Sequence, residues 1–541
     1  MRGLSAWSAS LAAVAALASA LPAAPVPAPV PAGPPLSGAA HLRAESLNYA
    51  HQLLNIVATI EMEYVRPVSR ADLAEAALTG LYEAARQPVP ASLKADLQRA
   101  GDGGDLLALL VRFREQLGDV DALRGNRALL VSLQALPRAL DPYCGLTSPQ
   151  EFRYLDLQEG VSATGLEFVG VTAPMLAGVV PGAGMVRGEV TFTFPPSGPA
   201  GPVRVQAVIP GSPAQRAGLR PADLIVKLDG RPPESPAFAG LLRRLLPPQP
   251  GLPTEPPAGL PPAVRLTLLR PGRAAPFDVT LAPAAFRPET VFGARRRGDG
   301  TWDYLLDPTE RIGYVRLGAI GGGSHAEFRD ALKSLRGQSV RGLVLDLRWC
   351  PGGYLRQAAT IARLLLPDGS PVANQRARTG QVTPVLSGPE AIGEPHLDFP
   401  VVVLVGGETS GGGELIAAAL QDSGRAVIAG QRTVGKATVQ TELGRTYNIP
   451  FKLTTGTFVR PSGKSLQRYP DSKPSDDWGI RPDAGRELPL TAESSRRLRE
   501  WWTLHALRPA DSAEALPVDD PENDPQRQAA VQMVRELIRK P

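Results

Sequence analysis

The sequence is poor in side chains that commonly bind metals or form catalytic triads. Its 541 residues include two cysteines, Cys144 and Cys350, and five histidines, at positions 41, 51, 325, 396 and 505. The histidines show neither metal-ligand spacing nor a triad context, and neither cysteine has a ligand neighbour at short spacing. We therefore predict no metal and no cofactor. The cysteines would pair only if the fold brought them together, and two buried free thiols are the favoured alternative.

The sequence also lacks a long apolar run beyond its first residues. Arg2 precedes an uncharged, alanine-rich run from Leu4 to Leu21, and Ala18 and Ala20 form an A-x-A-like cleavage pattern. An uncleaved membrane anchor is the alternative, but the most apolar part is short against the ~20 residues of a spanning helix. We expect residues 1–20 to be a signal peptide. The mature protein is then exported, to the periplasm or cell surface, with no integral membrane span.

Dense basic clusters are scarce, although the formal net charge is +5. Arginines are scattered along the chain, with only short groups such as residues 295–297. Nucleic-acid binding normally needs a denser basic patch on a recognisable motif, so we expect no nucleic-acid partner. A hydrophobic content of 43% with 21% charged residues is typical of a soluble globular protein of several domains.

The pattern then changes along the chain. Residues 21–40 form a Pro/Ala linker, and residues 41–155 are mostly helical because apolar residues recur at helical spacing from Leu47 to Val57. Residues 156–285 contain short β-type runs separated by Gly and Pro. The order of strand, short helix and strand in VQAVIPGSPAQRAGLRPADLIVKLDG resembles a PDZ domain. An unrelated small β-barrel is the alternative.

The PDZ resemblance implies where a peptide would bind. In PDZ domains a glycine-containing loop receives a terminal carboxylate, and the peptide adds a strand to the sheet edge. That loop corresponds to Gly165, Leu166, Glu167 and Phe168. The expected partners are therefore protein or peptide substrates with free C-termini. A long Gly/Pro-rich insert at about 172–201 departs from the pattern.

Strands and helices alternate in residues 286–490. The runs GYVRLG, GLVLDL, VVVLVG and AVIAG are separated by helical patterns around 326–335, 355–366 and 414–421, which predicts an α/β core with largely parallel strands. A C-terminal helical segment at 491–541 is predicted to hold two amphipathic helices, around 494–507 and 525–539. The fold class is thus α/β multidomain, with an inserted β-rich domain and a helical N-terminal region.

Glycine-rich turns follow three of these strands, in DLRWCPGG, GGETSGGGELIAAALQDSGRA and GQRTVGKATVQ. With FKLTTGTFVRPSGKSLQ and GIRPD, these stretches resemble the tail-specific, or C-terminal processing, peptidase family. The resemblance implies a serine nucleophile, a lysine general base and a glutamine that orients the lysine. The lysine and glutamine correspond to Lys436 and Gln440, in the context GK-x-x-V-Q.

The nucleophile position departs from the family. The family's serine lies three residues before the glutamate of S-x-S-x-S-E, and counting back from Glu414 gives Gly411. Ser410 is a candidate substitute, which would require a shift of the turn because adjacent helical residues point ~100° apart. The resemblance assigns the oxyanion-hole N–H groups to Gly353 and Gly412.

Two functions follow from these residues. The first is an exported serine-type endopeptidase that recognises C-terminal tails through its PDZ domain and uses Ser410. The second is an inactive peptidase-like scaffold that binds tails without cutting them. Gly411 favours the second, whereas the retained Lys436 and Gln440 favour the first.

Overall fold

The computed structural model describes residues 38–540 except for a set of gaps. The gaps are 101–103, 147–160, 164–165, 170–201, 236, 239–240, 242–262, 283, 287–288, 386–397, 444–450, 470–471 and 508–523. The expected signal peptide and most of the expected linker lie outside the described residues. In the described part of the chain, no helix has the length and apolar character needed to cross a membrane.

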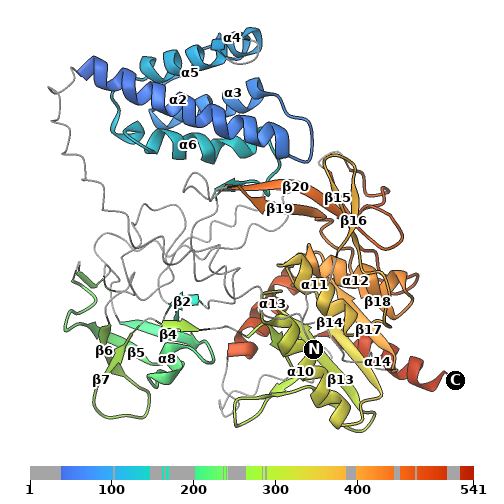
Figure 1. Cartoon of the computed structure of the whole chain (residues 1–541). Coiled ribbons are helices and arrows are strands. Elements are labelled where there is room, and N and C mark those ends of the chain that lie inside the picture. The colour runs from blue at the N-terminus through green and yellow to red at the C-terminus, as the bar shows by residue number, and fades with distance from the viewer. Residues whose placement is uncertain are drawn as a thin grey trace, which may run out of the picture.

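The N-terminal region is a bundle of helices, drawn in blue in Figure 1. Its helices are α2 (Gly38–Glu63), α3 (Arg70–Ala84), α4 (Leu93–Arg99), α5 (Gly104–Gln116) and α6 (Arg127–Ala135), with short 3₁₀ turns at Asp121–Leu123 and Leu136–Arg138. The side chain of Ser69 caps α3 by accepting a hydrogen bond from the Asp72 N–H. The apolar faces of these helices form one core, which also takes in Phe451 and Leu453 from much later in the chain.

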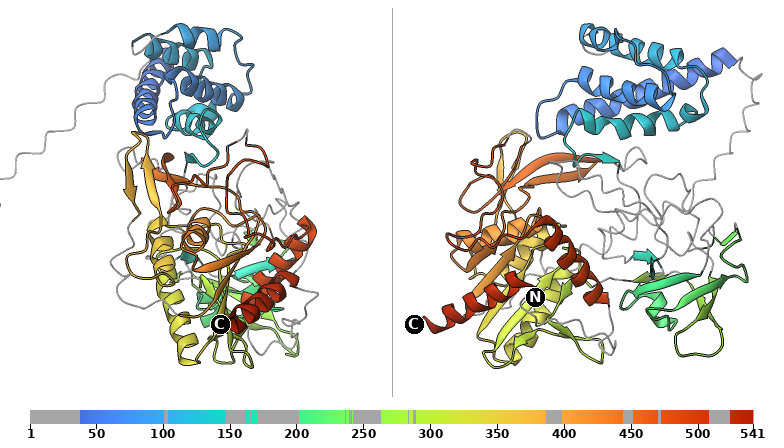
Figure 2. Two further views of the ribbon diagram at one scale, coloured as in Figure 1. Left: turned by 90° about the vertical axis from the view of Figure 1, so that its right-hand side faces the viewer. Right: turned by 180° about the vertical axis from the view of Figure 1, so that it is seen from behind.

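A five-stranded antiparallel sheet forms a separate lobe in the order β3-β4-β5-β6-β7 (Figures 1 and 2). The strands are β3 (Leu166–Val169), β4 (Val203–Val208), β5 (Leu224–Leu228), β6 (Val264–Leu269) and β7 (Phe277–Leu281), and the short helix α8 (Pro213–Arg216) follows β4. Alternate residues of β6 are buried, which gives this lobe its own apolar core. A two-stranded pairing of β2 (Val161–Ala163) with β8 (Ala284–Phe286) leads into and out of the lobe.

The C-terminal half is built around a sheet of parallel strands, as the alternating pattern predicts. Four parallel strands lie side by side in this sheet, in the same order as they occur along the chain. They are β13 (Ile312–Leu317), β14 (Gly342–Asp346), β17 (Val401–Val405) and β18 (Ala426–Gly430). Antiparallel β12 (Leu305–Asp307) and β9 (Val291–Phe292) pair with β13, and β10 (Arg295–Arg296) pairs with β11 (Trp302–Asp303). The carboxyl ends of the parallel strands therefore meet at one edge, where ligands bind in open α/β sheets.

Helices cover both faces of this sheet (Figures 1 and 2). Helices α10 (Ser324–Gly337), α11 (Leu355–Arg363) and α12 (Gly412–Asp422) pack on one face, which includes Val315, Leu345 and Val403. Helices α13 (Ala492–Leu507) and α14 (Pro525–Arg539) pack on the other face, which includes Val344 and Val402. Each strand is buried on both sides, which explains why these strands read as continuous apolar runs in the sequence.

A second, antiparallel sheet lies between the helical bundle and the α/β core (Figure 1). It has the order β1-β20-β15-β16, with β19 also paired to β20. Its strands are β1 (Gly145–Leu146), β15 (Asn374–Ala377), β16 (Val382–Pro384), β19 (Thr438–Glu442) and β20 (Phe451–Val459). Because β1 follows the helical bundle and pairs with β20, this sheet joins the N-terminal helical region to the C-terminal half of the chain.

Both cysteines are free and buried. Cys144 belongs to the core of the helical bundle, whereas Cys350 belongs to the core of the α/β sheet. Burial raises the pKa of both thiols, to about 11 for Cys144 and about 12 for Cys350. The expectation of two buried free thiols is therefore confirmed.

Candidate active site

The lysine and glutamine singled out in the sequence are in direct contact. Lys436 lies in the loop after β18, and Gln440 lies on β19. The Lys436 Nζ donates to Gln440 Oε1 at 2.9 Å and has a longer contact with the Thr438 carbonyl oxygen at 3.4 Å. Gln440 Nε2 in turn donates to Thr454 Oγ1 at 3.1 Å. The glutamine amide is thus held between a donor and an acceptor.

The environment of the lysine favours its neutral form. Burial lowers the pKa of Lys436 from 10.5 to about 8, and the nearby Lys452 acts in the same direction. The carboxylates of Glu414 and Asp141 oppose this shift in the pKa. A lysine with a pKa near 8 has a sizeable neutral fraction close to neutral pH, as a general base requires.

Gly411 occupies the first position of the turn that starts α12. Its backbone angles are φ 52° and ψ −114°, a conformation that residues with a side chain rarely adopt. A Cβ built on Gly411 would have ordinary contacts, 3.6 Å from the Pro351 oxygen and 3.9 Å from the Gly352 Cα. The turn therefore has room for a side chain at this position, at the cost of backbone strain of about 1–3 kcal/mol.

Ser410 is placed as a part of the turn rather than as a partner of the lysine. Its N–H donates to the Cys350 oxygen at 3.0 Å, and its carbonyl accepts from the Gly413 N–H at 3.0 Å. The residue is 5% exposed. Among the residues that the structure describes, no hydrogen bond joins the Ser410 hydroxyl to the Lys436 amine. The structure brings Lys436 and Gln440 together and leaves Ser410 outside that pair.

Glu414 connects the two sides of the site. This fully buried carboxylate accepts hydrogen bonds from the N–H groups of Gly411 at 3.0 Å, Gly435 at 2.7 Å and Lys436 at 2.8 Å, and from the Thr433 hydroxyl. Burial raises the pKa of Glu414 to about 7, while the four donors favour the ionised form. One carboxylate therefore fixes the backbone of Gly411, the predicted nucleophile position, relative to that of Lys436, the predicted base.

The turn Pro351–Gly353 packs closely against the start of α12. A Cβ on Gly352 would lie 2.5 Å from the Gly412 nitrogen, and one on Gly353 would lie 1.9 Å from the Ile320 oxygen. Within the described residues, neither Gly353 N–H nor Gly412 N–H donates a hydrogen bond. Two N–H groups without an acceptor beside the nucleophile position are what an oxyanion hole needs. The predicted donors thus lie on adjoining turns, and their role stays a prediction.

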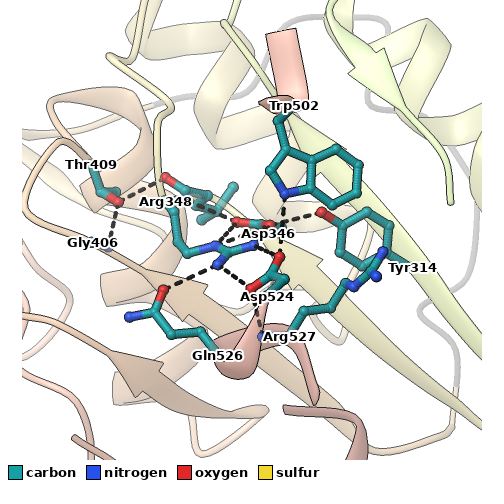
Figure 3. Close-up of polar contacts among 10 residues, drawn as sticks. Tyr314, Asp346, Arg348, Gly406, Thr409, Trp502, Asp524, Gln526 and Arg527 are labelled. Carbon is teal, nitrogen blue, oxygen red and sulfur yellow. Dashed lines mark hydrogen bonds and ion pairs between the residues drawn. The ribbon is translucent and has the colours of Figure 1, made fainter. Parts of the chain in front are cut away.

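Arg348 anchors the strand end that leads into this turn (Figure 3). Its guanidinium, which is 2% exposed, donates to Asp346 Oδ2 and Asp524 Oδ2 at 2.7 Å each and to Gln526 Oε1 at 3.0 Å. Tyr314 adds a hydrogen bond from its hydroxyl to Asp346 Oδ2 at 2.7 Å, and Trp502 one from Nε1 to Asp524 Oδ2 at 3.2 Å. The C-terminal helices are therefore tied to β14 by buried, paired charges.

Thr409 extends this anchoring to the turn before α12. Its hydroxyl donates to the Leu347 oxygen at 2.7 Å and accepts from the Gly406 N–H at 2.9 Å (Figure 3). Trp349 and Cys350, which precede the turn Pro351–Gly353, are both buried. They pack into the two cores on opposite faces of the sheet.

The predicted peptide-binding loop is described only in part. Gly165 lies outside the described residues, and Leu166, Glu167 and Phe168 form most of β3. Strand β3 pairs with β4 and is the end strand of its five-stranded sheet in the described part of the chain. An end strand has backbone groups to which a peptide strand can be added.

Several residues of the site were not predicted from the sequence. These residues are Glu414, Thr454 and Arg348, each of which contacts other elements of the site. For Arg348 the sequence does contain a signal. Asp346 and Arg348 stand at the end of an apolar strand, and charged residues at such a place are rarely buried unless they are paired. Thr454 has no comparable signal, because it is one of three threonines in the short stretch TTGT.

Comparisons with known proteins agree with this architecture. Residues 311–485 match the model of peptidase family S41, and residues 204–242 match that of a PDZ domain. The chain is 29% identical over 290 residues to the carboxyl-terminal-processing protease of Synechocystis sp.. It is 27% identical over 289 residues to the carboxy-terminal processing protease CtpA of Bacillus subtilis. These alignments cover 53% of this chain, and 60% and 54% of the two relatives.

The chain thus spans less than two thirds of the length of these relatives. Among solved structures, the photosystem II D1 C-terminal processing protease aligns with 80% of this chain and 98% of its own, at 22% identity and a TM-score of 0.34. The family matches confirm the resemblance that the motifs indicate and the multidomain α/β fold with a PDZ domain. Through residues 311–485 the chain belongs to peptidase family S41, and it carries a PDZ domain at residues 204–242.

Proposed function

We propose that this protein is an exported, peptidase-like scaffold that binds the C-terminal tails of other proteins and does not cut them. The observation that carries the proposal is the turn at Gly411, which has no side chain at the position where the motif predicts the nucleophile. The Glu414 carboxylate accepts from the Gly411 N–H and holds the turn in place. A shift that moved Ser410 into the same place would break this contact.

Tail binding is supported by the PDZ match and by the end position of β3. The test is titration of the mature chain with a peptide that has a free C-terminal carboxylate and with its amidated copy. We expect the amidated peptide to bind at least about tenfold more weakly, because the loop N–H groups then lose a charged acceptor. Equal affinities would contradict this mode of binding.

A serine-type endopeptidase is the second candidate function, and the Lys436–Gln440 contact favours it. A lysine with a lowered pKa can act as the general base that removes a proton from a nucleophile, and the Gln440 amide orients this lysine. In this case Ser410 would have to replace the missing serine. Cleavage of an unstructured tail by the parent chain, abolished by Ser410→Ala, would establish this function. The scaffold proposal expects no cleavage by either protein.

Export is supported by the charged start, apolar run and Ala18/Ala20 pattern at the N-terminus. Expression in a bacterial host, followed by fractionation and N-terminal sequencing, tests it. We expect a mature protein that begins near Leu21 in the periplasmic or surface fraction. An intact Met1 in the cytosolic fraction would contradict export.

A further inference from the structure

Thr454 is the point at which the N-terminal helical region reaches the lysine site. This residue of β20 is fully buried, and its Oγ1 accepts from Gln440 Nε2 at 3.1 Å. On its other side it is held by the helical region. The Thr454 N–H donates to Cys144 Sγ at 3.4 Å, and its carbonyl accepts from the Val65 N–H at 2.8 Å. The Cys144 thiol also approaches Thr454 Oγ1, at 3.5 Å.

The Thr454 hydroxyl holds the Gln440 amide in the orientation that the lysine requires. A protonated lysine has three donors and no acceptor, so only the amide oxygen can bind it. The amide nitrogen must then point away and find an acceptor, because a buried donor left unpaired costs about 1–3 kcal/mol. Thr454 Oγ1 is that acceptor. A side chain of the same shape without a hydroxyl would leave the amide nitrogen without its acceptor, so the amide would be held less firmly against Lys436.

The segment Asp141–Cys144 contributes more than the cysteine to this site. The ring of Tyr143 lies with its centroid 4.9 Å from Lys436 Nζ, which favours the ammonium form. Asp141 accepts from the Tyr143 N–H at 2.9 Å and from the Tyr64 hydroxyl at 3.2 Å. Its carboxylate acts on the lysine charge from the helical region. One short segment after the helices thus faces the base from two directions.

We propose that the N-terminal helical region positions the general base of this site, with Thr454 as the positioning residue that fixes the Gln440 amide and Cys144 as its support. This inference rests on the role of Lys436 as the base in the second candidate function, the serine-type endopeptidase. The charged groups that face the lysine are Lys452 on β20, Glu414 on α12 and Asp141 from the helical region. None of them is changed in the variants below.

The experiment compares the pKa of Lys436 in Thr454→Val, Thr454→Ser and the parent chain. Lysine labelled with ¹³C at Cε reports the pKa by NMR titration, and Lys436→Arg assigns the signal. Thr455→Val is the matched control, because the Thr455 hydroxyl contacts Thr441 Oγ1 at 2.7 Å across the same two strands. Thermal melts check that each variant is folded.

We expect Thr454→Val to lower the pKa of Lys436 by roughly half a unit to one unit, since the ammonium loses its amide acceptor. Thr454→Ser keeps the hydroxyl and should leave the pKa within about 0.2 units, as should Thr455→Val. Cys144→Ala should cause a smaller fall than Thr454→Val. An unchanged pKa in folded Thr454→Val and Cys144→Ala would overturn the proposal.

A second readout uses the Gly411→Ser background, where the lysine would have a nucleophile to activate. Thr454→Val should lower kcat about tenfold with KM unchanged, and Thr454→Ser should restore it. If Gly411→Ser is inert, the assignment of Lys436 as a base fails, while the pKa comparison still decides whether Thr454 orients the amide. An equal loss of kcat in Thr454→Val and Thr455→Val would mean that β20 acts only as a structural strand and would contradict the positioning role.

Discussion

The two halves of the candidate site are supported by different regions of the chain, and the predicted nucleophile half lacks a side chain at Gly411. The base half, Lys436 and Gln440, is held against the N-terminal helical region through Thr454. The nucleophile half, Gly411 and the adjoining glycine turn, is held against the C-terminal helices through Arg348. The two halves differ because Gly411 has no side chain, although its backbone is held in place by Glu414.

This comparison shows that the geometry of the site does not depend on the nucleophile. Glu414 joins the halves through backbone N–H groups, and a glycine offers the same N–H as a serine. The turn can therefore keep its register after the side chain is lost. The lysine has a separate reason to stay in place, because its amine is bound by Gln440 and not by the nucleophile turn.

The largest effect on stability is expected on the nucleophile half. Replacing Arg348 with methionine leaves the buried carboxylates of Asp346 and Asp524 without their cation, which should cost about 3–5 kcal/mol of unfolding free energy. Arg138→Met is the matched control, since both partners of the Arg138–Glu83 pair are about half exposed. Its cost should stay under about 1 kcal/mol. Denaturant unfolding measures both, and equal losses would contradict the anchoring role of Arg348.

A smaller loss is expected where the glycine turn packs on the start of α12. Gly352 has a φ of 88°, and an added Cβ would lie 2.5 Å from the Gly412 nitrogen, so Gly352→Ala should cost roughly 2–4 kcal/mol. Gly407→Ala serves as control, because a Cβ there meets nothing within 4 Å. Thermal unfolding of the two variants should separate them clearly. A Gly352→Ala protein as stable as Gly407→Ala would refute the close packing of this turn.

The smallest effect concerns the base half and depends on pH. The pKa of Lys436 is lowered from 10.5 to about 8 in the folded protein, so the unfolded chain binds more protons between these values. Lys436 therefore makes the folded state more stable as the pH rises from about 8 to 10.5. Unfolding of the parent and of Lys436→Met at pH 7, 9 and 10 measures the difference. The parent should gain relative to the variant with rising pH, and a constant difference would mean an unshifted lysine.

The sequence was sufficient to predict the parts of this site that lie within single strand-to-helix units. Lys436 and Gln440 are four positions apart in one motif, and their contact follows from that spacing once the loop and strand are known. The glycine turns were equally visible, because positive φ angles and close backbone packing leave few alternatives to glycine. Helices α10 and α12 include the predicted segments and extend slightly beyond them. Helix α11 begins where predicted and ends at Arg363, before the predicted end at residue 366.

Contacts between distant parts of the chain could not be predicted in this way. Cys144 and Thr454 are 310 positions apart, and Arg348 and Asp524 are 176 positions apart. Neither pair has a local pattern that specifies its partner, since hydrophobic periodicity indicates which residues are buried and not which distant residue each one contacts. Their meeting depends on how the second sheet joins the helical bundle to the core, which no periodicity reports.

A site that lacks only a hydroxymethyl group at Gly411 should regain tail cleavage in Gly411→Ser, and the pH dependence of that cleavage is the decisive measurement. Cleavage should be absent in the parent and in Gly411→Ala, which has the same backbone strain without a hydroxyl. In Gly411→Ser it should appear, rise with pH to a plateau above about 8 as Lys436 becomes neutral, and vanish when Lys436→Ala is added. A folded Gly411→Ser protein that cleaves no unstructured tail at any pH would contradict this expectation.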